Sequence, residues 1–247
     1  MTTAKPLPAK HYRYLDFVMV GFVAVLLCSN LIGPAKQVEL SLPFALPLIG
    51  DRLLFGAGNI FFPLGYIFGD ILTEVYGYAR ARKVIWAGFG AMLFATIMTL
   101  VVIHLPGNRT DTAFQVPYQD AVKLALGGTW RIALASLIAY WVGDFANSYV
   151  LAKMKVLTKG RWLWTRTIGS TIVGQGLDSL IFYPLAFYGV WKEGLVLAML
   201  VNWGFKVGVE VIFTPLTYLI VNALKRAEHE DYYDVGTNFT PFSIEDK

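Results

Sequence analysis

The chain alternates between long apolar runs and short polar segments. Six of the apolar runs are long enough to cross the roughly 30 Å hydrocarbon core of a bilayer as helices. The pattern therefore predicts an all-α membrane protein with six transmembrane helices. The predicted spans are about Tyr14 to Gly33, Leu53 to Tyr76, Val84 to Leu105, Thr129 to Leu151, Thr167 to Tyr188, and Gly194 to Leu224.

The composition supports the membrane class. Hydrophobic residues make up 56% of the 247 residues and charged residues 15%, whereas soluble domains carry about 25% charged residues. The mean hydropathy is +0.53. The net charge of +4 does not indicate nucleic-acid binding, because the basic residues lie at the ends of the spans. The single cysteine, Cys28, excludes an intramolecular disulfide.

Basic residues concentrate in alternate connections between the spans. The remaining connections carry few basic residues, and acidic residues lie close to those few. Because basic loops stay on the cytoplasmic side, both termini are predicted to be cytoplasmic. The basic set consists of Lys5, Lys10 and Arg13; Arg80, Arg82 and Lys83; Lys153, Lys155, Lys159, Arg161 and Arg166; and Lys225 and Arg226. The sparse set consists of Lys36 and Arg52, Arg109 and Lys123, and Lys192.

Three segments outside the spans have features of their own. Residues 37–49 alternate in polarity and form either a small hairpin or an ordinary loop. Residues 106–128 contain a short amphipathic stretch. Residues 1–226 are predicted to form one transmembrane domain, and residues 227–247 an acidic cytoplasmic tail that is either disordered or packed on the inner face.

Asp178 lies inside the predicted fifth span. Arg166 precedes it by twelve residues and Lys192 follows it by fourteen, which places it roughly 18–21 Å from either charge along a helix. A carboxylate at the centre of a membrane costs about 2.5–3.5 kcal/mol and usually faces a cavity or a partner. Gln175 lies three residues earlier and therefore on the same face.

The predicted sixth span carries a polar stripe of Asn202, Lys206 and Glu210, each four residues apart. Residues at this spacing share one face of a helix. One interpretation is a Lys206–Glu210 pair that neutralises itself and locks two helices together. The other is that the stripe meets Gln175 and Asp178 across a cavity.

The second and fourth spans carry polar residues closer to the inner basic clusters. In the second span, Asp70 and Glu74 are expected to pair with the basic residues of 80–83. In the fourth span, Asp144, Asn147 and Ser148 are expected to pair with Lys153 or Lys155.

Other residues of the spans suggest local geometry. Pro63 in the second span predicts a kink. Gly169, Gly174 and Gly176 in the fifth span allow another helix to approach closely. Tyr66, among other aromatic residues inside the spans, could stack on a flat ligand.

Enzyme signatures are missing from the sequence. It has no HExxH, no glycine-rich phosphate loop and no GxSxG. The chain is therefore predicted to be neither an enzyme nor an ATP hydrolase, and to need no metal or cofactor.

Several long segments carry a resemblance to a known family. These are FFPLGYIFGDILTEVYGYARARKVIW (61–86), DFANSYVLAKMKVLTKGRWLWTRTIGSTIVGQGLDSLIF (144–182), NWGFKVGVEVIFTPLTY (202–218) and the residues around Cys28. Together they closely resemble the queuosine-precursor transporter (VUT) family. The resemblance implies a bacterial inner-membrane protein similar in fold to the substrate-binding subunits of energy-coupling-factor vitamin transporters. It also implies uptake of 7-cyano-7-deazaguanine or 7-aminomethyl-7-deazaguanine.

The polar residues of the spans are compatible with such a substrate. A guanine-like edge presents adjacent N–H donors, which Asp178 or Glu210 could accept. Its carbonyl and ring nitrogens need donors such as Lys206. The predicted substrate-binding residues are Asp178, Gln175, Lys206, Glu210, Asn202, Asn59, Tyr66, Asp70 and Trp203.

Other functions remain open at this point. The chain could be a binding subunit that needs a separate ATP-driven module, or a transporter of another planar heterocycle or vitamin. A membrane-embedded enzyme and a receptor that does not transport are further alternatives. The preferred precursor, the energy source, any energising partner and the oligomeric state, including a homo-oligomer, are not determined by the sequence.

Overall fold

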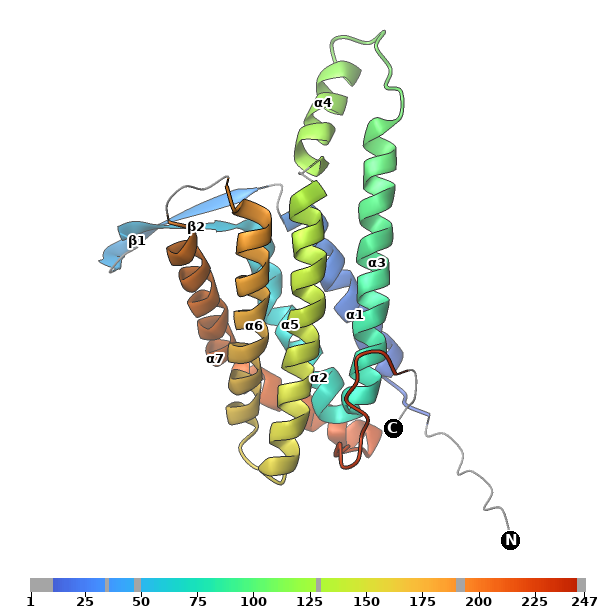
Figure 1. Ribbon diagram of the computed structural model, residues 1–247, viewed down its shortest axis with the longest axis vertical. Helices are drawn as coiled ribbons and strands as arrows, with labels where there is room; N and C mark the ends of the chain where they lie inside the picture. Colours follow the sequence, from blue (N-terminus) through green and yellow to red (C-terminus); the bar gives the residue numbers. More distant parts are fainter. Residues whose placement is uncertain (1–10, 34–35, 47–49, 128–129, 190–193, 244–247) are drawn as a thin grey trace.

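The computed structural model describes residues 11–33, 36–46, 50–127, 130–189 and 194–243 (Figure 1). Lys5, Lys10 and Lys192, which belong to the predicted loop charges, lie outside the described residues. The described part is mostly helical. Its elements are α1 (Leu15–Leu27), a π-helical turn (Cys28–Ile32), β1 (Gln37–Leu46), β2 (Gly50–Gly56), a 3-10 helix (Ala57–Phe61), α2 (Phe62–Tyr76), α3 (Tyr78–His104), α4 (Gln115–Leu126), α5 (Trp130–Leu157), α6 (Leu163–Phe187) and α7 (Leu195–Glu228).

Three helical stretches among the described residues are long and apolar enough to cross a membrane: Leu15–Ile32, Tyr78–His104 and Leu195–Glu228. A fourth results if α4 and residues 131–157, which meet at an angle of 40°, are counted as one span. α6, with 25 residues, occupies the predicted fifth span and is long enough to cross a membrane, but it is not among the stretches that are also apolar enough. The molecule is a multi-pass membrane protein, and six spans remain a prediction.

The predicted second span begins too early in the sequence. Residues 53–56 belong to β2, a 3-10 helix follows, and α2 begins only at Phe62. α2 has 15 residues, or about 22 Å of helix, which is short of a full crossing. Pro63 lies in its first turn, where the missing N–H costs nothing. Pro63 therefore lies at the N-terminal end of α2 and not within a helix, and the predicted kink is wrong.

The segment before α2 is an antiparallel hairpin of β1 and β2. Gln37 pairs with Gly56, and Ser41 pairs with Arg52. A hairpin is predicted within residues 37–49, but its second strand is β2, and residues 53–56 of β2 belong to the predicted second span. This hairpin is an addition to the predicted all-α fold. It lies at the upper end of the bundle in Figure 1.

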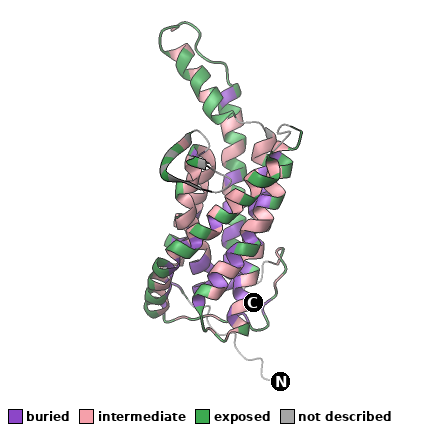
Figure 2. Ribbon diagram, turned by 90° about the vertical axis from the view of Figure 1, so that its left-hand side faces the viewer, coloured by how far each residue is buried: buried purple, intermediate pink, exposed green. Residues whose placement is uncertain are grey.

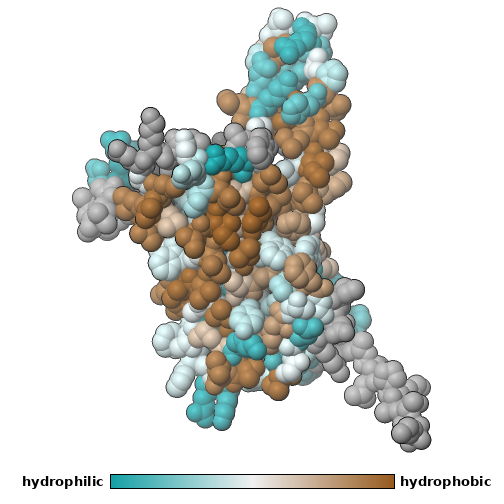
Figure 3. All heavy atoms as spheres, in the orientation of Figure 1, coloured by the Kyte–Doolittle hydropathy of each residue, from teal (hydrophilic) through white to brown (hydrophobic). Residues whose placement is uncertain are grey.

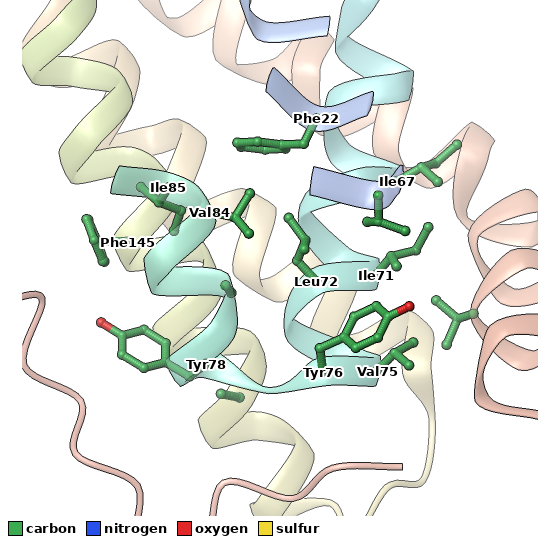
Figure 4. Packing of buried hydrophobic residues seen from close by; sticks show 14 of the residues in the cluster. Phe22, Ile67, Ile71, Leu72, Val75, Tyr76, Tyr78, Val84, Ile85 and Phe145 are labelled. Atoms are coloured by element: carbon green, nitrogen blue, oxygen red, sulfur yellow. The ribbon is translucent and has the colours of Figure 1, made fainter. Parts of the chain in front are cut away.

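Buried residues gather in the lower half of the bundle (Figure 2). There α2 and α3 join through Gly77, whose φ of +87° is a conformation that glycine adopts without steric cost. The flanking Tyr76 and Tyr78 are fully buried, and Figure 4 shows them at the base of the core with Leu72 and Val75. The opposite half is packed less completely and contains the cavity described below.

Apolar side chains cover the middle of the visible face, while polar groups gather at the tip of α4 and at the lower end (Figure 3). Phe94, Ile97, Ile212 and Leu219 are among the exposed large hydrophobic residues. Such a continuous exposed apolar surface fits contact with lipid.

The tail after α7 is packed against the lower end of the bundle. The Arg82 guanidinium, fully buried, donates to the carbonyls of Asn238 (2.7 Å) and Thr240 (2.8 Å). The Asp234 carboxylate accepts the backbone N–H of Tyr78 at 3.1 Å through each oxygen. Of the two alternatives for the tail, the described residues up to 243 therefore favour a packed segment.

Candidate functional site

A cavity of about 770 Å³ lies inside the bundle, toward the end that carries the hairpin. Its volume falls within the range of small-molecule sites, roughly 300–1,000 Å³. Most of its wall is apolar, with a few polar groups pointing inward. The polar side chains in the wall include Asn30, Asn59, Tyr66, Ser136, Asp144, Asn147, Gln175, Asp178, Asn202 and Lys206.

An ion pair between α6 and α7 forms part of this wall. Nζ of Lys206 donates to Oδ2 of Asp178 at 2.6 Å. The Lys206 side chain is 7% exposed and that of Asp178 21%. The Lys206 ammonium also lies 4.8 Å from the centre of the Phe62 ring, within the range of a cation–π contact. The predicted fifth and sixth spans therefore do face each other at this depth.

Glycines bring α5 and α6 together beside the ion pair. A Cβ on Gly174 would lie 2.7 Å from Cβ of Asn147 and 2.8 Å from the carbonyl oxygen of Gly143. A Cβ on Gly143 would lie 3.0 Å from Cβ of Asp178. This close approach brings Asp144 and Asn147 of α5 to the same cavity as Asp178. The expected role of Gly174 in helix packing is confirmed.

The predicted site residues divide into two groups. Six of them line the cavity: Asn59, Tyr66, Gln175, Asp178, Asn202 and Lys206. The other three, Asp70, Trp203 and Glu210, are not part of its wall.

The side chain of Trp203, on α7, packs against α6. Its Nε1 donates to the carbonyl of Ile172 at 3.1 Å, and Gly176 gives the indole room. It therefore packs α7 against α6, and Trp203, predicted as a substrate-binding residue, is not part of the cavity wall.

Glu210 does not pair with Lys206. The lysine is held by Asp178, so the interpretation of a self-neutralising Lys206–Glu210 pair is wrong. Glu210 is 1% exposed, and neither of its carboxylate oxygens has a hydrogen-bond partner. Asp70 is equally buried, and its Oδ2 also has no partner.

The expected pairing of Asp70 and Glu74 with residues 80–83 is wrong. Glu74 accepts two hydrogen bonds of 2.8 Å from Arg166, a bidentate contact, and a third of 2.5 Å from Lys225. Nζ of Lys155 lies 3.4 Å from Oε1 of the same carboxylate. The basic residues after α2 are used elsewhere, as when Arg82 binds the tail. Sequence distance hid these partners, because Arg166 is 92 residues from Glu74.

Asp231 of the tail completes this group of charges. It accepts from Lys155 at 2.5 Å and lies 2.8 Å from Lys225. Burial raises the pKa of the Asp231 carboxyl, but hydrogen bonds from the two lysines outweigh burial and hold the pKa below its ordinary value. We call Glu74, Lys155, Arg166, Lys225 and Asp231 the inner ion cluster. It joins α2, α5, α6, α7 and the tail.

The expected pairing of Asp144 and Asn147 with Lys153 or Lys155 is also wrong. Lys155 belongs to the inner ion cluster, and Lys153 lies over the ring of Phe239 at 3.9 Å. Asp144 instead lines the cavity, within electrostatic range of Asp178 and Lys206.

The wall also contains polar residues that were not singled out as site residues. Ser136 of α5 donates to Oδ1 of Asn30 at 2.8 Å, and Asn30 in turn donates to the carbonyl of Leu26 at 2.9 Å. Both residues line the cavity. From the sequence alone, polar residues that line a site near the end of a span look the same as polar residues that simply end a helix. Within the described part of the chain, no group of three or more His, Cys, Asp or Glu side chains could hold a metal ion.

Residues 56–220 match the protein family described as "Putative vitamin uptake transporter". A "Probable queuosine precursor transporter" of Bacillus subtilis (strain 168) is 32% identical over 204 residues, which cover 82% of this chain and 81% of the relative. The "Queuosine precursor transporter" of Escherichia coli (strain K12) is 25% identical over 220 residues, covering 87% and 90%. A "Probable queuosine precursor transporter" of Haemophilus influenzae is 27% identical over 174 residues, covering 68% and 69%. No solved structure matches the chain. The names of these relatives indicate transport and not catalysis.

Proposed function

The chain belongs to the queuosine precursor transporter family, and on that premise we propose that it imports 7-deazaguanine precursors of queuosine across the bacterial inner membrane, with both termini cytoplasmic. The substrates are 7-cyano-7-deazaguanine, 7-aminomethyl-7-deazaguanine or both. The observation that carries the proposal is the Asp178–Lys206 ion pair in the wall of a cavity of about 770 Å³.

Asp178 is the residue that reads the base edge. A carboxylate offers about four lone-pair sites, so Asp178 can keep Lys206 and still accept the adjacent N–H donors of a guanine-like edge. Glu210 is the less suitable candidate of the two, because it does not line the cavity.

Lys206 and the amides supply the complementary donors. The ammonium of Lys206 lies beside Asp178 and can donate to the carbonyl next to the N–H group on the same edge. Gln175, one turn from Asp178 along α6, and Asn202, one turn from Lys206 along α7, present amides to the same space. Tyr66 lines the cavity from α2 and offers a ring on which the planar base can stack.

This site should discriminate strongly between purine edges. A base with an adenine-like edge would place an acceptor against the Asp178 carboxylate and leave buried polar groups unpaired. Sites built to pair a particular polar edge can reject mismatches by factors of about 10⁴–10⁵.

Uptake by the purified chain, reconstituted alone into liposomes, tests the proposal. Labelled 7-cyano-7-deazaguanine should enter vesicles that contain the protein, and unlabelled guanine-edge analogues should compete with it better than adenine-edge analogues. Binding without entry would instead support a subunit that needs an ATP-driven module. If the substrate neither binds to the protein nor enters the vesicles, the proposed substrate class is refuted.

A further inference from the structure

Two buried acids lie outside the wall of the cavity, on helices that contact each other. Asp70 is on α2 and Glu210 on α7, each 1% exposed, and α2 packs against α7. Both oxygens of Glu210 and Oδ2 of Asp70 have no hydrogen-bond partner. Glu74, one turn from Asp70, has three cationic partners. Cations are therefore available to carboxylates in this part of the bundle, yet Asp70 and Glu210 have no cationic partner.

The groups around Asp70 explain why neither acid has a cationic partner. Asp70 lies within electrostatic range of Glu210, Glu74 and Arg166, and the side-chain amide of Asn147 donates a hydrogen bond to its carboxyl group. Arg166 is occupied by Glu74. Of the described residues, no lysine or arginine forms an ion pair with Asp70 or Glu210.

Two neighbouring carboxylates in a low-dielectric interior repel each other strongly when both are charged. Close carboxylates can share one proton, as the two aspartates of aspartic proteases do. An Asp70–Glu210 pair that holds a proton would carry one negative charge instead of two.

Two side chains connect this pair to the cavity. Lys206 is four residues from Glu210 on α7, so the two share one face and lie about one turn apart. Tyr66 is four residues from Asp70 on α2 and lines the cavity. Its buried hydroxyl has no partner and lies within electrostatic range of both Asp178 and Glu210.

We propose that Asp70 and Glu210 form a proton-binding site and that one proton is co-transported with each substrate molecule. The inference rests on the proposed function and adds its source of energy. A proton from water adds to a carboxylate oxygen of the pair, and on release it returns to water, with no change in oxidation state.

Lys206 couples proton and substrate. When Glu210 is neutral, Lys206 has no charged partner on its own helix and pairs with Asp178, as observed. In that position it completes the cavity wall as a donor to the base. When the proton leaves, ionised Glu210 attracts Lys206 one turn away, the donor is withdrawn and the substrate is released. Proton and substrate binding therefore favour each other, a reciprocal linkage.

Proteoliposomes with the membrane potential clamped at zero test this coupling. With an exterior one pH unit more acidic, one proton per substrate supports accumulation of 7-cyano-7-deazaguanine up to about tenfold, because one pH unit corresponds to a factor of ten. Glu210→Gln and Asp70→Asn should abolish accumulation but retain exchange of labelled for unlabelled substrate. Asp120→Asn, at an exposed carboxylate of α4, is the control and should accumulate normally.

If substrate accumulation in the vesicles does not depend on the pH gradient, or depends on a sodium gradient instead, the proposed proton site is wrong while the proposed function stands. Normal accumulation by Glu210→Gln would also overturn it. Infrared spectroscopy gives a readout without substrate: the wild type at neutral pH should show a protonated carboxylic acid band that Glu210→Gln weakens. If the substrate is not transported at all, the proposed function fails, and this band still decides the proton site.

Discussion

The Lys206 ammonium lies 2.6 Å from Oδ2 of Asp178 and joins α7 to α6 at the wall of the cavity. Both partners are largely buried, so the pair should contribute to folding as well as to binding. Removing one member leaves the other charge without its partner, which is the costly change for buried pairs.

Lys206→Met should therefore destabilise the protein more than the double substitution Lys206→Met with Asp178→Asn. The single substitution leaves a carboxylate in the bundle without a cation, whereas the double one leaves two neutral side chains. Thermal unfolding of the detergent-solubilised variants measures the difference. Equal losses of Tm in the two variants would show that the pair is not coupled.

Glu74→Gln should be among the most damaging single substitutions. It removes the anion that Arg166, Lys155 and Lys225 share, and breaking a buried pair costs about 3–5 kcal/mol. The expected result is a large fall in Tm and in the yield of folded protein. Glu39→Gln is the control, because the exposed Glu39–Arg52 pair should contribute less than about 1 kcal/mol. Similar losses for the two would contradict the role of the inner ion cluster.

Gly174→Ala should destabilise the contact between α5 and α6. The added methyl would meet Cβ of Asn147 at 2.7 Å and the Gly143 carbonyl at 2.8 Å, and overpacking of this kind costs about 1–3 kcal/mol. Gly208→Ala on α7 is matched in chemistry but meets nothing within 4 Å. It should be neutral or stabilising by about 0.5–1 kcal/mol, because alanine favours helix. Thermal unfolding of both variants checks the prediction, and a tolerated Gly174→Ala would refute the close packing.

Acid should weaken the attachment of the tail through Asp231. Its pKa is lowered in the folded protein by Lys155 and Lys225, so the unfolded chain binds a proton more readily. Stability from this group is present above the ordinary aspartate pKa of about 3.9 and is lost as the pH falls through the lower folded-state pKa. Asp231→Asn should remove this part of the pH dependence, as measured by Tm between neutral and acidic pH. Parallel curves for wild type and variant would contradict it.

Much of the candidate site follows from spacing along helices. The interval between Lys206 and Glu210, and the distance of Asp178 from flanking charges, predicted a polar site where α6 and α7 meet. Six of the nine predicted site residues line one cavity. Lys206 pairs with Asp178 because of how α6 packs against α7. Helix periodicity along α7 alone does not predict this packing.

The errors have a common physical origin. Periodicity predicts faces but not long-range partners, so Glu74 was matched with nearby basic residues while its partners came from α5, α6 and α7. Apolar residues 53–56 fitted either a membrane helix or a strand, and pairing with β1 determined the outcome. The packing of the tail on Arg82 involves backbone carbonyls, which leave no trace in side-chain patterns.

The role of Asp178 in substrate recognition is tested by calorimetry, which measures the affinity of 7-cyano-7-deazaguanine for the purified wild type and for Asp178→Asn. The wild type is expected to bind, and Asp178→Asn is expected to lose at least about tenfold in affinity, because one buried hydrogen bond to a charged group contributes about 1.5–3 kcal/mol. Asp120→Asn should bind as the wild type does. Equal affinity for wild type and Asp178→Asn, with both proteins folded, would contradict the assignment of Asp178 as the residue that reads the base.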